Sequence, residues 1–165
     1  MPDNLTIVKR TIEEHHNIKG HLKLVGDSVN DLEALLSLQK ARPDWILSSQ
    51  QELAEKKNKM LQTLSSLEEG LKNHFASEEK FLPPLFGELL MKALALEHKR
   101  IKRQLEEAKS LVNKTKLEGL SQKELLAKKS QIQQQLEGIL QLVEEHAATE
   151  ETILKMLEKA LEDKG

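Results

Sequence analysis

Apolar side chains recur along most of this chain at alternating steps of three and four residues. That spacing gathers them on one face of an α-helix, whereas a strand would alternate apolar and polar residues at every second position. The chain therefore predicts helices that each bury one stripe. The four stripes are Ile18, Leu22, Val25, Val29, Leu32 and Leu36; Met60, Leu64, Leu67 and Leu71; Leu94, Ile101, Leu105, Ala108 and Val112; and Ile132, Leu136, Ile139, Val143, Ile153 and Leu157.

The composition agrees with an all-α fold. Tyrosine is absent and aromatic residues make up only 2% of the 165 residues, although strands favour aromatic and β-branched side chains. Leu, Lys, Glu, Gln and Ala, which favour helix, are abundant. At this length we expect a single domain spanning residues 1–165.

Proline and glycine mark the predicted turns. Pro43 disfavours helix at the residue before it, and Pro83 with Pro84 ends the second helical segment. Gly119 suits a helix C-terminus. Short connections of this kind favour antiparallel neighbours and hence an up-down-up-down four-helix bundle.

Two sequence patterns indicate where helices begin. Ser49-x-x-Glu52 and Ser121-x-x-Glu124 have the spacing of capping boxes. Together with the turn residues, they predict helices at about 4–40, 49–81, 88–117 and 122–162.

Charge and composition exclude several functional classes. The chain has 25 basic and 27 acidic residues, interspersed, so a nucleic-acid partner is not expected. No apolar stretch approaches the roughly 18 residues of a membrane span, and no membrane partner is expected. Cysteine is absent, which excludes disulfides and thiolate ligands. The first residues lack the apolar core of a signal peptide, so we expect a cytoplasmic protein.

In each apolar stripe, a step of three or four positions from one of its apolar residues reaches a histidine. In the second and fourth stripes a glutamate follows the histidine by four residues, on the same side of the helix. The resulting inward-facing set is His15, His74, Glu78, His98, His146 and Glu150.

Burial of four imidazoles and two carboxylates is costly unless they are paired or bind metal. A single core histidine is more often hydrogen-bonded than metal-bound, so a metal-free structural bundle is the competing hypothesis. The position of all six side chains on the inward stripes favours a metal cluster.

The distances along the sequence allow the six side chains to meet at one level of an antiparallel bundle. In such a bundle, each turn falls midway between successive ligand positions. The midpoints are Trp45, Gly87 and residue 123, each close to a predicted turn. Because a helix rises only about 1.5 Å per residue, the remaining offsets are small.

Nitrogen and carboxylate ligands without sulfur suit iron, manganese or zinc. If both glutamates bridge two ions, each ion receives two histidines, two carboxylate oxygens and one bridging oxo or hydroxo group. An octahedral ion then keeps one open position for a small molecule. Zinc prefers four ligands and has no redox chemistry, so we hypothesise a non-haem site of two iron ions.

The segments that carry these residues resemble the hemerythrin-like domains, also called HHE cation-binding domains. The resemblance covers nearly the whole chain and rests on EEHHNI, HFASEEKFLPPLF, LEHKRI and HAATEETILKML. It implies a four-helix bundle with a non-haem di-iron centre, in which histidines from all four helices bind iron and two glutamates bridge. Carried over by position, the ligands are His15, His74, Glu78, His98, His146 and Glu150.

One position departs from the oxygen-carrying members of that family. They have a further histidine four residues before the one on the third helix, where this chain has Leu94. The site would then lack the fifth histidine that saturates one iron, so reversible oxygen carriage is not the expected function. We expect instead the binding of a small gaseous ligand, dioxygen or nitric oxide, in sensing or in iron and stress handling, with no obligatory catalysis. An oxidoreductase that reduces peroxide or nitric oxide at the same centre is the alternative.

Overall fold

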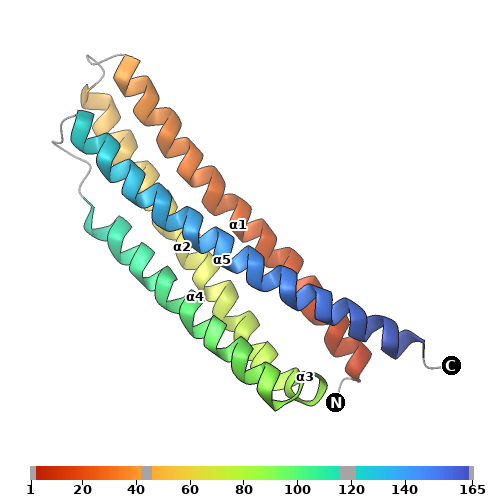
Figure 1. Ribbon diagram of the computed structural model, residues 1–165. Helices are drawn as coiled ribbons and strands as arrows, with labels where there is room; N and C mark the ends of the chain where they lie inside the picture. Colours follow the sequence, from red (N-terminus) through yellow and green to blue (C-terminus); the bar gives the residue numbers. More distant parts are fainter. Residues whose placement is uncertain (1–2, 42–45, 116–121, 164–165) are drawn as a thin grey trace.

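The computed structural model describes residues 3–41, 46–115 and 122–163, and their side chains except those of 28–29, 31–41, 46–53, 122 and 125. Four long helices make up nearly all of it: α1 (Asn4–Ala41), α2 (Ile46–Phe81), α4 (Glu88–Lys114) and α5 (Gln122–Glu162). A single short helix, α3 (Pro83–Phe86), lies between α2 and α4 (Figure 1). The predicted all-α bundle is confirmed.

The long helices form a closed ring around one core. α1 packs against α2 and α5, and α4 packs against the same two helices from the other side. Helices that follow one another in the chain run in opposite directions, and both chain ends lie at the end of the bundle that carries α3 (Figure 1). The ring order is therefore α1, α2, α4, α5, and every long helix faces the centre.

The turn before α4 differs from the simple break predicted at the prolines. Leu82 (φ −85°, ψ −21°) precedes α3, whose first two positions are Pro83 and Pro84. Proline is tolerated there because the first helical N–H groups have no intrahelical acceptor. Gly87, at φ +85° and ψ 163°, then separates α3 from α4. One short helical turn thus joins α2 to α4.

Two predicted helix ends are wrong. α2 begins at Ile46, so Ser49 lies inside the helix and is not its cap. α4 ends at Lys114, because Thr115 has extended backbone angles. The other predicted turn residues lie outside the described residues: Pro43, Trp45, Gly119 and Ser121.

The core consists of two apolar clusters. The larger one contains residues from all four long helices, among them Ile18, Met60, Val112 and Ile132. The smaller one, near α3, contains Ile7, Val8, Leu82, Met91, Leu94 and Leu154. The predicted stripes are buried wherever their side chains are described, except Ile153 and Leu157, which are half-buried; Val29, Leu32 and Leu36 lie outside that part.

The stripe on α5 shifts near its C-terminal end. Leu154 is fully buried, whereas Ile153 is only half-buried. His146, Glu150 and Leu154 follow one another at steps of four, so the buried row continues past the glutamate to Leu154. The prediction of Ile153 as an inward residue is therefore wrong.

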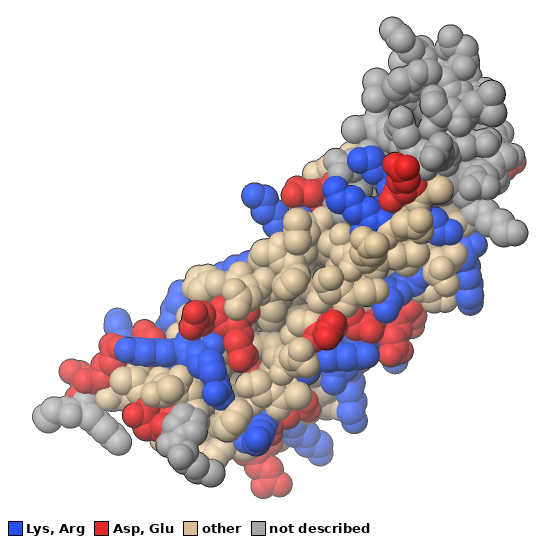
Figure 2. Space-filling view, turned by 180° about the vertical axis from the view of Figure 1, so that it is seen from behind, with Lys and Arg blue, Asp and Glu red and all other residues tan. Residues whose placement is uncertain are grey.

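The outer surface carries charges of both signs. Figure 2 shows basic and acidic side chains intermingled along one face, with uncharged residues between them. Along the described residues, no helix has an apolar stretch of the length and hydropathy that a bilayer requires.

Gly87 and Gly138 form a matched pair for testing the turn. The Gly87 backbone lies in a region that only glycine adopts readily, so Gly87→Ala is expected to lower the free energy of unfolding by roughly 1–3 kcal/mol. Gly138 lies within α5 with open space around an added methyl group, so Gly138→Ala is expected to stabilise by about 0.5–1 kcal/mol. Urea unfolding measures both, and a neutral Gly87→Ala would contradict the assigned turn.

Candidate metal centre

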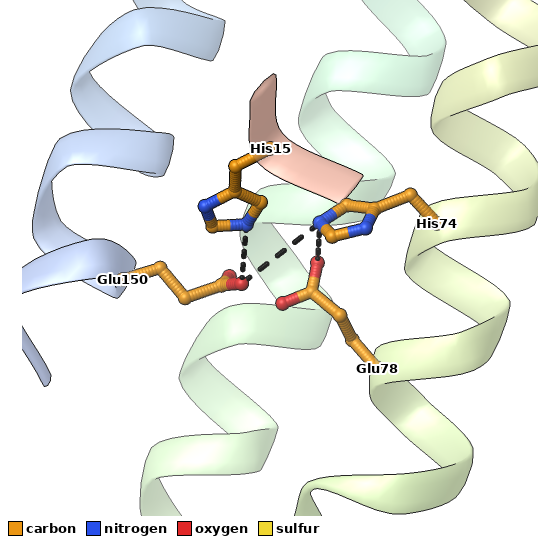
Figure 3. A group of neighbouring side chains, drawn as sticks. All are labelled: His15, His74, Glu78 and Glu150. Carbon is orange, nitrogen blue, oxygen red and sulfur yellow. Dashed lines mark hydrogen bonds and ion pairs between the residues drawn. The ribbon is translucent and has the colours of Figure 1, made fainter. Parts of the chain in front are cut away.

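Six ionisable side chains lie together between the two apolar clusters. Each long helix contributes one histidine, and α2 and α5 each add a glutamate one turn later. Figure 3 shows four of them pointing toward one another: His15, His74, Glu78 and Glu150. None of the six is more than 5% exposed: His15, His74, Glu78, His98, His146 and Glu150. The structure thus brings all six predicted residues together.

The six side chains divide into two groups that share both carboxylates. Within each group, one nitrogen or oxygen atom from every residue lies within 4.8 Å of the others. Each group has the composition of a cation site, and Glu78 and Glu150 belong to both. One group is His15, His74, Glu78 and Glu150, and the other is Glu78, His98, His146 and Glu150.

Contacts inside the cluster are short, but most lack hydrogen-bond geometry. His15 Nε2 and Glu150 Oε1 are hydrogen-bonded at 3.0 Å. His74 Nε2 lies 2.6 Å from Glu78 Oε1 and His146 Nε2 lies 3.1 Å from Glu150 Oε2. Among the described residues, neither of those two nitrogens has a hydrogen-bond partner, and the same holds for both oxygens of Glu78.

Unsatisfied buried polar atoms carry a free-energy cost of about 1–3 kcal/mol each. Here they are imidazole nitrogens and carboxylate oxygens aimed at a common centre. These atoms are the ligands that iron, manganese and zinc accept. A shared cation would satisfy them together, so the residues present fit a bound metal.

The outward-facing nitrogen of each histidine is close to a further glutamate. His74 Nδ1 donates a hydrogen bond to Glu14 Oε2 at 2.7 Å, and His146 Nδ1 donates one to Glu97. His15 Nδ1 lies 3.6 Å from Glu151 and His98 Nδ1 lies 3.9 Å from Glu79. We call these four carboxylates the outer glutamates: Glu14, Glu79, Glu97 and Glu151.

Sequence reasoning missed the outer glutamates. Glu79, Glu97 and Glu151 are rotated by about 100° from the inward residues, and on an isolated helix such positions indicate surface carboxylates. The signal that could have found them is their position next to each ligand. Glu-His-x-x-Ile occurs at residues 14–18 and again at 97–101, and a Glu-Glu pair follows His74 and His146 by four.

Burial and neighbouring groups shift the pKa of His15, His74 and His98. Burial, reinforced by the nearby His146 and His74, lowers the pKa of His98 to about 3. Burial and the nearby His74 lower the pKa of His15. For His74, burial acts in the same direction, but the nearby carboxylates of Glu78 and Glu14 outweigh it and raise the pKa. His15 and His98 are therefore neutral at pH 7, the form in which histidine binds metal.

The neighbouring residues also distinguish candidates that the sequence left close together. His16 is exposed, whereas His15 is 2% exposed. His21 is half-buried, with its ring against Gly70. Leu94, one turn before His98, is buried in the smaller apolar cluster.

A cavity of about 320 Å³ lies beside the cluster, between α1, α2 and α5. His15, His74 and His146 form part of its wall, and the remaining wall is largely apolar. Lys19 and Glu151, paired at 3.2 Å, also line it. A small molecule in this cavity would contact three of the four histidines directly.

The helical ring and its buried His/Glu cluster define a cation-binding four-helix domain. A family model described as the Hemerythrin HHE cation binding domain matches residues 6–158. The chain belongs to this family. No curated protein and no solved structure shows a significant match.

The metal-free protein is expected to lose stability as the pH falls. An unfolded chain protonates His98 near pH 6.5, whereas the folded chain does so near pH 3, so acid favours unfolding throughout that window. His15 acts in the same direction, and the smaller opposite shift of His74 opposes it. Between pH 7.5 and pH 5 we expect a loss of about 1–2 kcal/mol.

Urea unfolding of chelator-treated protein at the two pH values measures this loss. His98→Asn should flatten the pH dependence, and His16→Asn, at an exposed position, should leave it unchanged. Equal stability at pH 5 and pH 7.5 would contradict the neutral, buried state of His98.

Proposed function

We propose that the chain holds two non-haem iron ions, with Glu78 and Glu150 bridging them. His15 and His74 would hold one ion, and His98 and His146 would hold the other. The observation that supports this assignment best is that the two candidate ligand groups share both carboxylates and no histidine. Two separate mononuclear sites would not require that sharing.

The ligand count leaves room for an external molecule. The chain offers each ion two nitrogens and two carboxylate oxygens, and the oxo or hydroxo bridge expected from the sequence makes five ligands. Leu94 adds no sixth, because its side chain is apolar and lies in the smaller cluster. Iron held there would supply binding of, and electron transfer to, dioxygen or nitric oxide.

The chain's own part in this function is to bind, orient and shield. The two apolar clusters close the bundle above and below the centre. Phe75 stacks on His98 with ring centroids 3.9 Å apart, which fixes that imidazole plane. The cavity offers neutral small molecules a largely apolar route to the side formed by His15, His74 and His146.

This arrangement supports a gas-binding, sensing or iron- and stress-handling role with no obligatory catalysis. The cytoplasmic location and the single-domain organisation expected from the sequence stay predictions. Steady consumption of peroxide or nitric oxide in the presence of a reductant would replace this proposal with the oxidoreductase alternative.

Adjacent histidines offer a direct test of the ligand assignment. Protein loaded anaerobically with Fe(II) should hold two iron ions per chain. His15→Ala removes a buried nitrogen that faces the centre and should lower that content and change the absorption spectrum. His16→Ala alters an exposed residue one position away and should change neither.

The two outcomes separate the remaining hypotheses. If the wild-type protein holds no more than trace iron, the hypothesis of a metal-free structural bundle remains. Equal iron content in both variants would show that His15 is not a ligand.

Filling the cavity should slow ligand entry without removing the metal. Ala147 lines the cavity and is 9% exposed, so Ala147→Leu places a larger side chain beside His146. We expect the rate of nitric oxide binding to fall severalfold in stopped-flow absorbance, with iron content unchanged. Ala93→Leu, at an exposed position on α4, is the control. An unchanged rate for Ala147→Leu would exclude the cavity as the route.

A further inference from the structure

The outer glutamates link the four helices in a closed circuit. Each lies on one long helix and approaches the histidine of the next helix in the ring. The contacts are Glu14 on α1 to His74 on α2, Glu79 on α2 to His98 on α4, Glu97 on α4 to His146 on α5, and Glu151 on α5 to His15 on α1.

The circuit follows from sequence adjacency and helix geometry. Every outer glutamate is the immediate neighbour of one of the six central residues. Adjacent residues on a helix differ by about 100° in direction. When one side chain faces the centre, the next one points sideways, toward the helix packed alongside. The central site and its outer contacts are therefore built from the same four short segments.

The four contacts are unequal in a regular way. Glu14 and Glu97 accept true hydrogen bonds from Nδ1 of the neighbouring histidine. Glu79 and Glu151 lie 3.9 and 3.6 Å from theirs, beyond hydrogen-bond distance. Each candidate ligand group thus contains one tightly held histidine and one loosely held histidine. The tightly held histidine is His74 in one group and His146 in the other.

Other contacts explain part of this inequality. Glu151 is also paired with Lys19 at 3.2 Å, which draws its carboxylate toward the rim of the cavity.

Glu14 is 30% and Glu97 51% exposed, so solvent screens their charge. The hydrogen bonds remain effective because they end on imidazoles that are about 95% buried.

We propose that Glu14 and Glu97 are positioning residues, one for each of the two metal ions. Each carboxylate accepts a hydrogen bond from Nδ1–H. It thereby holds its histidine as the tautomer whose Nε2 lone pair faces the centre. It also increases the electron donation of that imidazole to the metal. This inference rests on the proposed function, because it assigns the two ions to the two ligand groups.

Loss of either carboxylate should affect one metal ion and not the other, which general destabilisation would not do. Glu14→Gln should lower the affinity only for the ion held by His15 and His74. Glu97→Gln should lower the affinity only for the ion held by His98 and His146. Each single variant then binds one metal ion tightly and one weakly, and the double variant binds both weakly. Glutamine keeps the size of the side chain and removes its charge.

Titration of the full-length metal-free chain with Co²⁺, in competition with a chelator, measures the two affinities. We expect a loss of about 10–100-fold for one ion in each single variant. Glu79→Gln and Glu151→Gln should have smaller effects, since their carboxylates are not hydrogen-bonded to histidine. Glu13→Gln removes a charge from an exposed neighbour of Glu14 and should have none.

Two further measurements distinguish positioning from folding. The melting temperature of the metal-free variants should match that of the wild type. In iron-loaded protein, removal of either carboxylate should raise the reduction potential, because the oxidised, more positive centre loses a stabilising negative charge.

The possible outcomes separate this inference from the proposed function. Wild-type protein that binds fewer than two Co²⁺ ions would overturn both. If the wild type binds two ions tightly, two results would overturn only the positioning role. One is an equal effect of substituting each of the four outer glutamates, and the other is no effect of Glu14→Gln and Glu97→Gln. A lowered melting temperature of the metal-free variants with unchanged metal affinity would also overturn it.

Discussion

The bundle is organised around two carboxylates buried at its centre among four imidazoles. Glu78 and Glu150 are 1% and 0% exposed, in a position where a charge without partners would be strongly destabilising. Their surroundings supply nitrogens from all four long helices, and those helices must keep their relative heights for the atoms to meet. The lengths of the connections, the prolines before α4 and the glycine at Gly87 are consistent with that requirement.

The two apolar clusters have different parts in maintaining the centre. The larger cluster contains most of the buried apolar residues and joins all four long helices. The smaller one closes the end near α3, where Leu82 and Leu154 are completely buried. Because hydrophobic burial is non-directional, these clusters keep the helices together without orienting any imidazole. Orientation comes from directed contacts, namely the stacking of Phe75 on His98 and the hydrogen bonds of Glu14 and Glu97.

The family match and the residue chemistry agree on cation binding, and both depend on the same short segments. The two halves of the chain repeat one plan, in which a Glu-His helix is followed by a His-x-x-x-Glu-Glu helix. In the ring, this plan gives each ligand group one histidine from each kind of helix. The cavity touches only three of the four histidines, so the site has chemically similar halves but unequal access.

The sequence by itself determined the all-α fold, the inward stripes and the six central residues, since helical periodicity and spacing between turns are local properties that can be counted along the chain. It failed where a choice depended on contact with another helix. Leu154 rather than Ile153 is buried where α5 meets its neighbours. Glu14 and Glu97 resemble solvated side chains on an isolated helix. Only the packing of α1 beside α2, and of α4 beside α5, brings their carboxylates to a neighbour's imidazole, because sideways direction has meaning only once the adjacent helix is in place.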